Sequence, residues 1–526
     1  MNSYVKICTA AALAPVILFI LGCSDANDHS ANSSGLEPQP QDPAEILSIF
    51  QPQVELPPQA GNISLVATFF NLASVGYEAQ EYFLSGTASA FTNLSELTPD
   101  GQWQVEAGDT DEYKTRVVVY RPIDATAFSG TAIVEWLNVS AGFDSAPIWL
   151  ASHVEIMRKG HAWVAVSAQK VGIEGQENSI LPIKLHLKGT QPERYASLTH
   201  PGDGYAYDIF SQVAQALRQP DSVDLLGGLD LRRLIAAGQS QSAWTLATYI
   251  NAIQPLYQAY DGFLLAGRPV MSWSQQSDGW VPGEPQGSAP LAWPPQTPIP
   301  TPAVVTIRQD IDAPVMMLQT ETDVVALASF SLRQPDSSHF RLWEVAGTSH
   351  ADLYTTVTGQ FDTGSEPSIP VVTEESSVFG VINCDLPMNA GPLPWVLQRA
   401  VNALDIWVRR GEEPPTAQRL EVTTDGQTLL LDDIGNALGG IRTPYVDAPA
   451  ALLSGLGQNS ESFCSLFGTT ALFDTATMAS LYVDQTGYEQ AVAAAADDAV
   501  AMGFLLPQDA RRVKVAASLQ WQALEQ

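Results

Sequence analysis

The sequence predicts an α/β fold, in which a mainly parallel β-sheet is covered by helices on both faces. Short, almost wholly apolar runs alternate with stretches of helical spacing along most of the chain. A strand buried on both faces reads as a continuous apolar run, and such strands are typical of parallel sheets. No period of about 20 to 50 residues recurs, which excludes a repeat architecture. With 526 residues and 45% hydrophobic content, the chain can form one large domain with additions, or two domains.

The expected elements follow one another in the order that this fold requires. Strands are predicted at 81–90, 116–120, 131–137, 161–167, 233–237, 260–266, 313–319 and 340–346. Helices are predicted at 148–159, 207–218, 244–253, 395–409 and 488–502, with a hairpin-like segment at 420–432. Gly160 and Gly411 follow two of these helices, where a terminating glycine is common.

The charge balance bears on partners rather than on the fold. Against 25 basic residues the chain carries 57 acidic ones, which gives a net charge of −32. Such a surface repels phosphate backbones and anionic lipid headgroups, so nucleic acid and electrostatic membrane partners are disfavoured. The same charge is expected to keep the protein in solution.

The N-terminus resembles an export signal. Residues 1–22 contain one positive charge and an apolar run that is short for a membrane-spanning helix. The letters ILGC at 20–23 resemble a bacterial lipobox, in which Cys23 would become the lipidated first residue. Ser24 after it resembles the outer-membrane sorting pattern, so a place in the cell envelope is expected, with membrane contact only through the anchor. The alternative is an ordinary signal peptide with a chance cysteine. Residues 23–45 are polar and predict a flexible tether.

Two other cysteines are expected to pair. If Cys8 is removed with the signal peptide and Cys23 is lipidated, Cys384 and Cys464 remain in an oxidising compartment. A bond between them would close a loop of about eighty residues and stabilise the protein by roughly 4 kcal/mol. Two buried free thiols or a metal-binding pair are the alternatives.

The domain organisation is predicted from interruptions in the strand–helix pattern. The main domain is expected at 46–415, and an extension packed on it at 416–526. Residues 269–312 are rich in proline and glycine and contain Trp273, Trp280 and Trp293. A stretch of this length without regular structure is usually functional or disordered, and its aromatic content favours a lid with an apolar underside. A packed surface excursion without contact to substrate is the alternative.

One short stretch has the pattern of a nucleophile elbow. The apolar run 234–237 leads into Gly238-Gln239-Ser240-Gln241-Ser242, and a helical stretch follows. A serine at such a strained strand-to-helix turn needs small neighbours on both sides. Gly238 is one of them, and Ser242 occupies the position that usually holds a second glycine.

An acid and a base follow later in the chain, each at the end of a predicted strand. A serine hydroxyl is a weak nucleophile unless a base, itself oriented by an acid, takes its proton. The strand at 313–319 is followed by Glu321 and Asp323, and the strand at 340–346 by His350. Glu321 and Asp323 are two residues apart, so a continuing strand would present both on one side, and periodicity does not separate them. The other histidines read as surface or core residues.

Taken together, these motifs resemble the α/β-hydrolase superfamily, and within it a group of exported bacterial proteins with an alpha/beta hydrolase domain. The resemblance rests on the words EWLNVS at 135–140, VSAQ at 166–169, GQSQS at 238–242, WEVAGTSH at 343–350, GGIRTP at 439–444 and FCSLFG at 463–468. It covers nearly all of the mature chain. It implies the α/β-hydrolase fold with Ser240 as nucleophile and His350 as base, and it matches Asp323, rather than Glu321, to the acid.

The resemblance also implies an oxyanion hole made of two backbone N–H groups. One would come from Gln241, the residue after the nucleophile. The other would come from the loop after the strand at 131–137, where Val139 is the first choice and Ser140 is close behind. The alternative for that loop is a simple strand-to-helix turn.

The function expected from these residues is hydrolysis of a carboxylic ester through an acyl-enzyme, without a cofactor. The predicted lid favours a small-molecule ester with an apolar or aromatic portion. The chain lacks the sequence motifs of zinc proteases, P-loops and dinucleotide-binding folds, so metal and nucleotide chemistry are unsupported. Two alternatives remain: an amide or peptide hydrolase with the same triad, and a catalytically silent surface binding protein of hydrolase fold.

Overall fold

The computed structural model describes residues 48–175, 184–270, 304–459 and 463–524, and the backbone of two short strands, β8 (Pro290–Leu291) and β9 (Ile299–Pro300). The chain divides into two units, 1–44 and 45–526, and all named elements belong to the second. The predicted signal peptide, Cys23, the tether and most of the predicted lid, including its three tryptophans, lie outside the described residues. Among the described helices, none combines the length and the apolar character needed to cross a bilayer.

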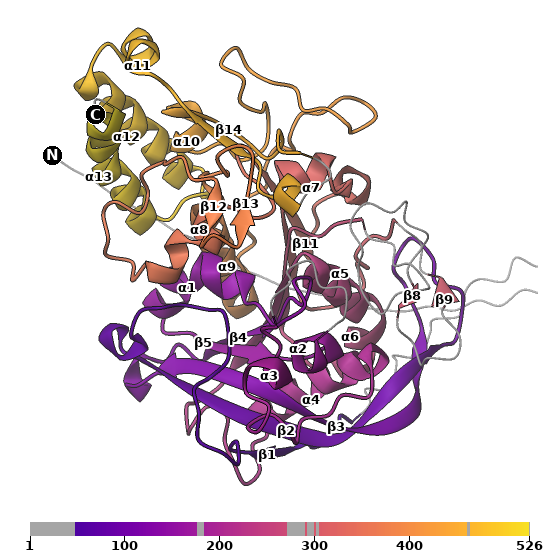
Figure 1. The fold of residues 1–526 in the computed structure, drawn as a ribbon. Helices are drawn as coiled ribbons and strands as arrows, with labels where there is room; N and C mark the ends of the chain where they lie inside the picture. The colour runs from indigo at the N-terminus through magenta and orange to yellow at the C-terminus, as the bar shows by residue number, and fades with distance from the viewer. Residues whose placement is uncertain are drawn as a thin grey trace, which may run out of the picture. The chain divides into compact units, whose positions relative to one another are not determined.

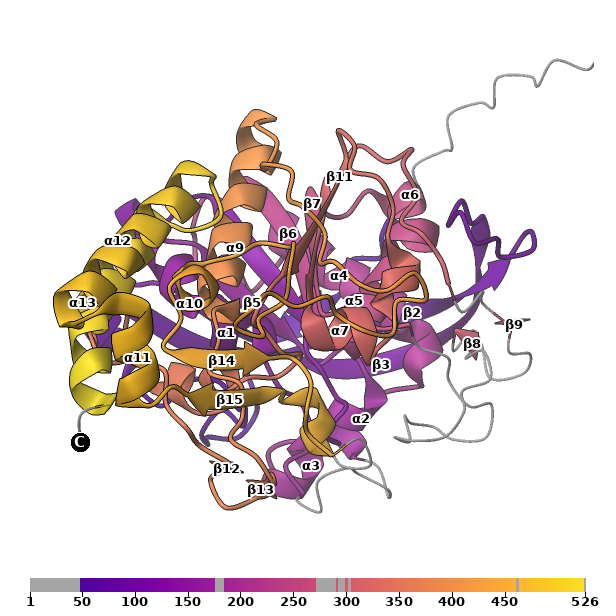
Figure 2. The same ribbon diagram turned by 90° about the horizontal axis from the view of Figure 1, so that it is seen from above.

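A nine-stranded sheet forms the centre of the second unit, in the order β1-β2-β3-β5-β4-β6-β7-β10-β11 (Figures 1 and 2). Its strands are β1 (Gln53–Glu55), β2 (Tyr77–Asn93), β3 (Val105–Pro122), β4 (Thr131–Trp136), β5 (Ala162–Val166), β6 (Arg233–Gln239), β7 (Gly262–Ala266), β10 (Val315–Thr320) and β11 (Phe340–Val345). From β5 to β11 every neighbouring pair is parallel, whereas β1, β2 and β3 pair antiparallel. The predicted α/β fold with a mainly parallel sheet is therefore confirmed.

The antiparallel edge is longer than the sequence predicts. Strands β2 and β3 span 17 and 18 residues and pair along nearly their whole length, although only 81–90 and 116–120 were expected. The first half of β3, around Asp109 and Asp111, is exposed and acidic. Its strand conformation comes from the backbone ladder with β2 and not from burial, so hydrophobic patterning does not detect it.

Helices cover both faces of the sheet, as predicted. Along β6, Leu234 and Ala236 belong to one hydrophobic core and Ile235 and Ala237 to another, because alternate side chains of a strand point to opposite faces. The first core lies beneath α4 (Ala206–Arg218), α5 (Gln241–Thr248) and α6 (Gln254–Tyr257). The second lies beneath α1 (Pro147–Arg158) and α9 (Leu393–Arg410). Between α5 and α6 the helix passes through a π-helical turn at Tyr249–Ile253.

The remaining α-helices and strands are short or belong to the C-terminal part. They are α2 (Lys170–Glu174), α3 (Leu187–Thr190), α7 (Glu321–Val325), α8 (Leu353–Thr356), β12 (Ser377–Val378), β13 (Ile382–Asn383), α10 (Pro444–Asp447), β14 (Ala451–Ser454), β15 (Thr469–Leu472), α11 (Thr475–Tyr482), α12 (Gln485–Ala501) and α13 (Pro507–Leu524). The expected hairpin at 420–432 consists of isolated bridges, not of a regular pair of strands.

The C-terminal residues pack directly on the α/β core. Ile441 forms a parallel bridge with Val345 beside β11, and both its N–H and its carbonyl are hydrogen-bonded to that edge. Asp509 on α13 accepts a hydrogen bond from Arg158 on α1, over 2.7 Å. Figure 2 shows α12 and α13 at one side of the molecule, next to α10 and β14. The boundary at residue 415 stays a prediction, because residues 45–526 cluster as one unit.

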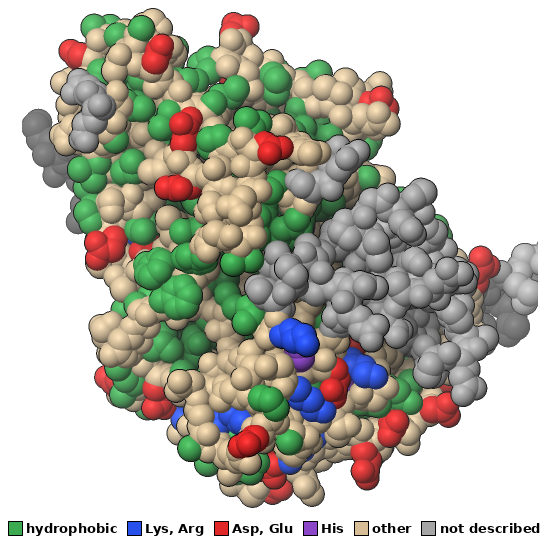
Figure 3. Space-filling model, in the orientation of Figure 1, with side chains coloured by type: hydrophobic (Ala, Val, Ile, Leu, Met, Phe, Trp, Pro, Cys, Tyr) green, Lys and Arg blue, Asp and Glu red, His purple; other side chains and the backbone are tan. Residues whose placement is uncertain are grey.

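Acidic side chains are scattered over the surface and do not gather at one place on the face shown in Figure 3. This distribution accords with the net charge of −32. Long-range repulsion of polyanions therefore stays the expectation for this surface.

The predicted disulfide is present. Cys384 and Cys464 are bonded, with their Cα atoms 5.6 Å apart and a separation of 80 positions in sequence. The bond ties the segment before α9 to the C-terminal residues that follow β14, and by closing this loop it lowers the conformational entropy of the unfolded chain.

We expect the double variant Cys384→Ser/Cys464→Ser to lose about 4 kcal/mol of unfolding free energy, because the unfolded chain regains the entropy of that loop. Urea unfolding of the oxidised wild type and the variant measures the difference. Equal unfolding midpoints and slopes would contradict the expectation.

Candidate active site

Ser240 sits at the tip of a strained turn between β6 and α5. Its backbone has φ 60° and ψ −122°, a conformation that non-glycine residues rarely adopt and that costs about 1–3 kcal/mol. The turn is tight on the side of Gly238, where an added Cβ would lie 3.0 Å from both Leu246 Cδ1 and Ser242 Cβ. Strain of this kind at a half-buried serine is typical of a nucleophile elbow.

Ser242 lies in the first turn of α5 and is fully buried. Within the described part of the chain its Oγ has no hydrogen-bond partner. The side chain therefore occupies the place of the second elbow glycine and faces no base.

Because Ser242 contributes a buried, unpaired hydroxyl, we expect Ser242→Ala to leave kcat unchanged and to raise the unfolding free energy by up to about 1 kcal/mol. Steady-state kinetics and urea unfolding test both parts. A loss of kcat comparable to that of Ser240→Ala would show that the two serines have been assigned the wrong way round.

His350 and Asp323 form a hydrogen-bonded chain with Ser240. His350 Nε2 lies 2.8 Å from Ser240 Oγ, and His350 Nδ1 lies 2.6 Å from Asp323 Oδ1. Ser240 follows β6, Asp323 follows β10 and His350 lies in the loop after β11, so all three stand at the carboxyl edge of the parallel strands. Asp323 and His350 are both buried.

The two candidate acids do not share one side, and the assumption of a continuing strand was wrong. β10 ends at Thr320, and Glu321 and Asp323 belong to the short helix α7. Asp323 Oδ2 accepts hydrogen bonds from the N–H and the hydroxyl of Thr320, which turns its Oδ1 toward His350. Glu321 instead accepts the N–H groups of Gly347 and Gly455, and burial raises its pKa to about 7.

Gly267, directly after β7, is a neighbour of the site that sequence reasoning missed. Its φ is +58°, and an added Cβ would lie 3.1 Å from His350 Nδ1 and 3.4 Å from Asp323 Oδ1. A side chain here would crowd the pair that orients the histidine. The only sequence signal is a glycine directly after a buried strand next to the elbow strand.

The loop after β4 lies beside the elbow and favours Val139 over Ser140 as a backbone donor. Ser140 N–H is taken by Asn138 Oδ1, over 2.9 Å. Asn138 Nδ2 in turn donates to Gln239 O, the residue before the nucleophile, over 3.0 Å. Within the described residues, the N–H groups of Val139 and Gln241 have no hydrogen-bond acceptor. Asn138 thus ties this loop to the elbow and leaves the two expected donors unused.

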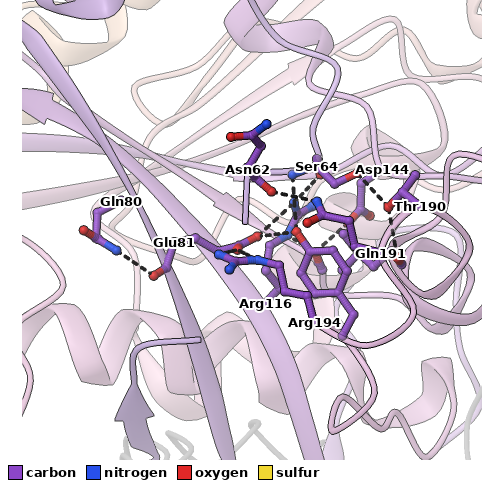
Figure 4. A network of polar contacts seen from close by, with 12 residues as sticks. Asn62, Ser64, Gln80, Glu81, Arg116, Asp144, Thr190, Gln191 and Arg194 are labelled. Carbon is purple, nitrogen blue, oxygen red and sulfur yellow. Dashed lines mark hydrogen bonds and ion pairs between the residues drawn. The ribbon is translucent and has the colours of Figure 1, made fainter. Parts of the chain in front are cut away.

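A buried ionic network contacts the same loop through Asp144 (Figure 4). Asp144, later in the loop, accepts hydrogen bonds from Arg116 Nη2 over 2.6 Å and from Ser167 Oγ over 2.5 Å. Arg194 pairs with Glu81, which also lies 3.8 Å from Arg116. All four charged side chains are buried, and burial raises the pKa of Asp144. The residues of this network come from segments far apart in sequence, so sequence reasoning missed the network.

Three other histidines are buried and serve the scaffold. His153 bonds to carbonyls of its own helix and to Asp362 O, and His200 bonds to Ala168 O. Burial lowers the pKa of each, and it lowers the pKa of His161 to about 4. In the described ranges, no group of three or more His, Cys, Asp or Glu side chains is arranged to hold a metal ion.

Comparison with known structures finds chains of low identity. An esterase from the fungus Rhizomucor miehei is 13% identical and aligns with 51% of this chain and 79% of its own, with a TM-score of 0.25. A carboxylesterase from Lactobacillus plantarum is 13% identical over 46% of this chain and 76% of its own, with a TM-score of 0.24. A Bacteroides fragilis protein provisionally assigned as an acetyl xylan esterase is 11% identical over 50% of this chain, with a TM-score of 0.26. This chain spans 63% of that protein's length. Comparison with curated proteins finds no match.

A family model gives the more informative result. The model described as "Alpha/beta hydrolase domain" matches residues 49–515, which include the whole central sheet, the elbow and most of the C-terminal extension. The match accords with the sheet order and with the strained serine after β6. The chain therefore belongs to the alpha/beta hydrolase domain family.

Proposed function

We propose that the protein is a serine hydrolase that cleaves carboxylic esters through a covalent acyl-enzyme on Ser240. The observation that carries this proposal is the chain of contacts from Ser240 Oγ to His350 Nε2, 2.8 Å, and from His350 Nδ1 to Asp323 Oδ1, 2.6 Å. A binding protein would have no need of this chain beneath a strained serine.

The chemistry follows from the positions of these atoms. His350 Nε2 takes the proton of Ser240 while Oγ attacks the acyl carbon, and Asp323 holds Nδ1–H and stabilises the imidazolium. The N–H groups of Gln241 and Val139 donate to the oxyanion of the tetrahedral intermediate. His350 then protonates the leaving alkoxide. Water, activated by the same nitrogen, releases the acid and restores the serine.

Matched ester and amide substrates with the same acyl group test the type of bond. We expect turnover of the ester at a much higher kcat/KM than of the amide, because His350 can protonate either leaving group but an ester carbonyl is more electrophilic and its alcohol leaves more readily than an amine. A higher kcat/KM for the amide would instead indicate that the enzyme cleaves a peptide or amide bond. Turnover of neither compound would favour the silent binding protein.

We further propose that the substrate has an apolar or aromatic portion, on the composition of residues 269–312. A series of esters with lengthening acyl and alcohol groups measures this preference. Equal kcat/KM across the series would overturn it.

We also propose that the protein is exported and lipid-anchored at Cys23, on the letters ILGC at 20–23. Membrane fractionation of cells that express wild type or Cys23→Ala tests the anchor. The wild type should sediment with membranes and the variant should not, and equal distributions would contradict the proposal.

A further inference from the structure

Glu321 is a fully buried carboxylate that the proposed mechanism does not use. Oε1 accepts the N–H of Gly347, 2.5 Å, in the loop that leads to His350. Oε2 accepts the N–H of Gly455, 2.7 Å, in the C-terminal extension. One side chain therefore joins the histidine loop to Gly455, which lies 134 positions after Glu321 in sequence.

Thr322, the next residue, also connects the histidine loop to Gly455. Its Oγ1 accepts the N–H of His350 itself, 3.1 Å, and donates to the carbonyl of Gly455, 2.6 Å. Thr348 O in the same loop accepts the N–H of Glu321, 3.2 Å. The backbone of His350 is thus hydrogen-bonded to the extension through a single hydroxyl.

The approach of Gly455 to α7 is too close for any side chain. An added Cβ would lie 2.6 Å from both Glu321 Cβ and Thr322 N, which is closer than real Cβ atoms come to other atoms. A glycine at this position is therefore a requirement of the contact, because only glycine lets the two backbones lie together.

Further contacts join the same loop to residues outside the central sheet. Asn389 Nδ2 donates to Gly347 O, 3.2 Å, and to Ser454 O, 3.1 Å. On the far side of His350, Ala351 N–H donates to Leu466 O, 2.9 Å, two residues beyond the disulfide cysteine Cys464. The loop that carries the base is held on both sides by segments outside the central sheet.

We propose that Glu321 and Thr322 are positioning residues through which the C-terminal extension holds His350 within hydrogen-bond reach of Ser240. This inference rests on the proposed function, because it gives the extension a part in the same triad. The loop after β11 has no regular backbone ladder of its own, so its donors need these acceptors. Loss of one acceptor leaves a buried N–H unpaired and lets the loop shift. A displacement of about 1 Å at a catalytic group is enough to lower kcat roughly 100-fold.

Two substitutions test the connection while keeping the shape of the side chain. Glu321→Gln replaces one acceptor oxygen with an amide N–H₂, and Thr322→Val removes the hydroxyl between His350 and Gly455. We expect each to lower kcat about 10- to 100-fold with KM within about twofold, because the substrate contacts stay in place.

Asp509→Asn is the matched control. Asp509 is also a buried carboxylate that joins the extension to the core, through Arg158 on α1, and it lies outside the contacts of the histidine loop. This variant should lose stability and keep the wild-type kcat. Near-UV circular dichroism and unfolding midpoints confirm that each variant is folded at the assay temperature, and Thr322→Val gives a second reading if Glu321→Gln is not.

The outcomes separate this inference from the proposed function. If the wild type is active and both variants keep its kcat, or if Asp509→Asn loses as much kcat as they do, the inference is overturned and the proposed function stands. If the folded wild type has no hydrolase activity, the proposed function fails and this inference fails with it.

Discussion

Asp323→Asn should lower kcat about 10⁴-fold, the largest kinetic effect of any single substitution outside Ser240 and His350. An asparagine fits the same space, so Thr320 can keep its contact with the side-chain oxygen. Its amide N–H₂ then faces His350 Nδ1, which must accept a hydrogen bond where it now donates one. The proton moves to Nε2, and the imidazole can no longer take the proton of Ser240. Steady-state kinetics over a range of pH measures the loss.

Glu321→Gln serves as the comparison for this prediction. Both substitutions convert a buried carboxylate of α7 to an amide, but only Asp323 contacts the imidazole. The loss should therefore be at least about 100-fold larger for Asp323→Asn, given the smaller effect expected of a positioning residue. Equal losses would contradict the separate roles given to the two carboxylates, and a larger loss for Glu321→Gln would reverse the assignment.

Arg116→Met should destabilise the fold by about 3–5 kcal/mol, the largest stability effect expected of a single substitution. Methionine is an unbranched side chain of similar length, but it leaves Asp144 buried without its cation. Arg194 continues to neutralise Glu81, over 2.5 Å, so the unpaired charge is that of Asp144. Its second oxygen already has no hydrogen-bond partner in the described chain, so the site cannot compensate. Urea unfolding measures the difference.

An exposed ion pair provides the control. Arg232 and Asp230 lie 2.8 Å apart with side chains 65% and 77% exposed. Arg232→Met should change the unfolding free energy by less than about 1 kcal/mol. If Arg116→Met also costs less than that, the buried network is not a determinant of stability.

The central sheet and the places of Ser240 and His350 at strand ends could be predicted from the sequence because their signals are local. Each buried strand from β4 to β11 is a short apolar run, and the elbow is a five-residue pattern beside one of them. The disulfide followed from counting: if the protein is exported to an oxidising compartment, as expected, the two cysteines outside the expected leader have few other partners.

The choice between the two candidate acids could not be made from the local sequence pattern. Glu321 and Asp323 are two residues apart, and the strand period predicts that both point the same way. The structure instead ends β10 at Thr320 and starts a helix, whose cap fixes Asp323 toward His350. The choice between the two acids therefore depends on a helix start that the strand pattern concealed.

Contacts between segments that are distant in sequence could not be predicted, because no sequence pattern indicates them. Gly455 fits against α7 because of a backbone approach, whereas most loop glycines simply allow a turn. Asp144 and Arg116 are charged residues in segments that otherwise read as loop and strand, and sequence gives no reason to pair them. Such contacts are decided by the folded chain as a whole.

Covalent labelling with a fluorophosphonate, followed by peptide mass spectrometry, tests the central claim most directly. The reagent reacts with serines that have an adjacent base, so it reports the proposed nucleophile without knowledge of the substrate. We predict one adduct on the wild type, located at Ser240, kept in Ser242→Ala and lost in Ser240→Ala. A folded wild type that stays unlabelled, or an adduct that persists in Ser240→Ala, would contradict the assignment of this protein as a serine hydrolase acting through Ser240.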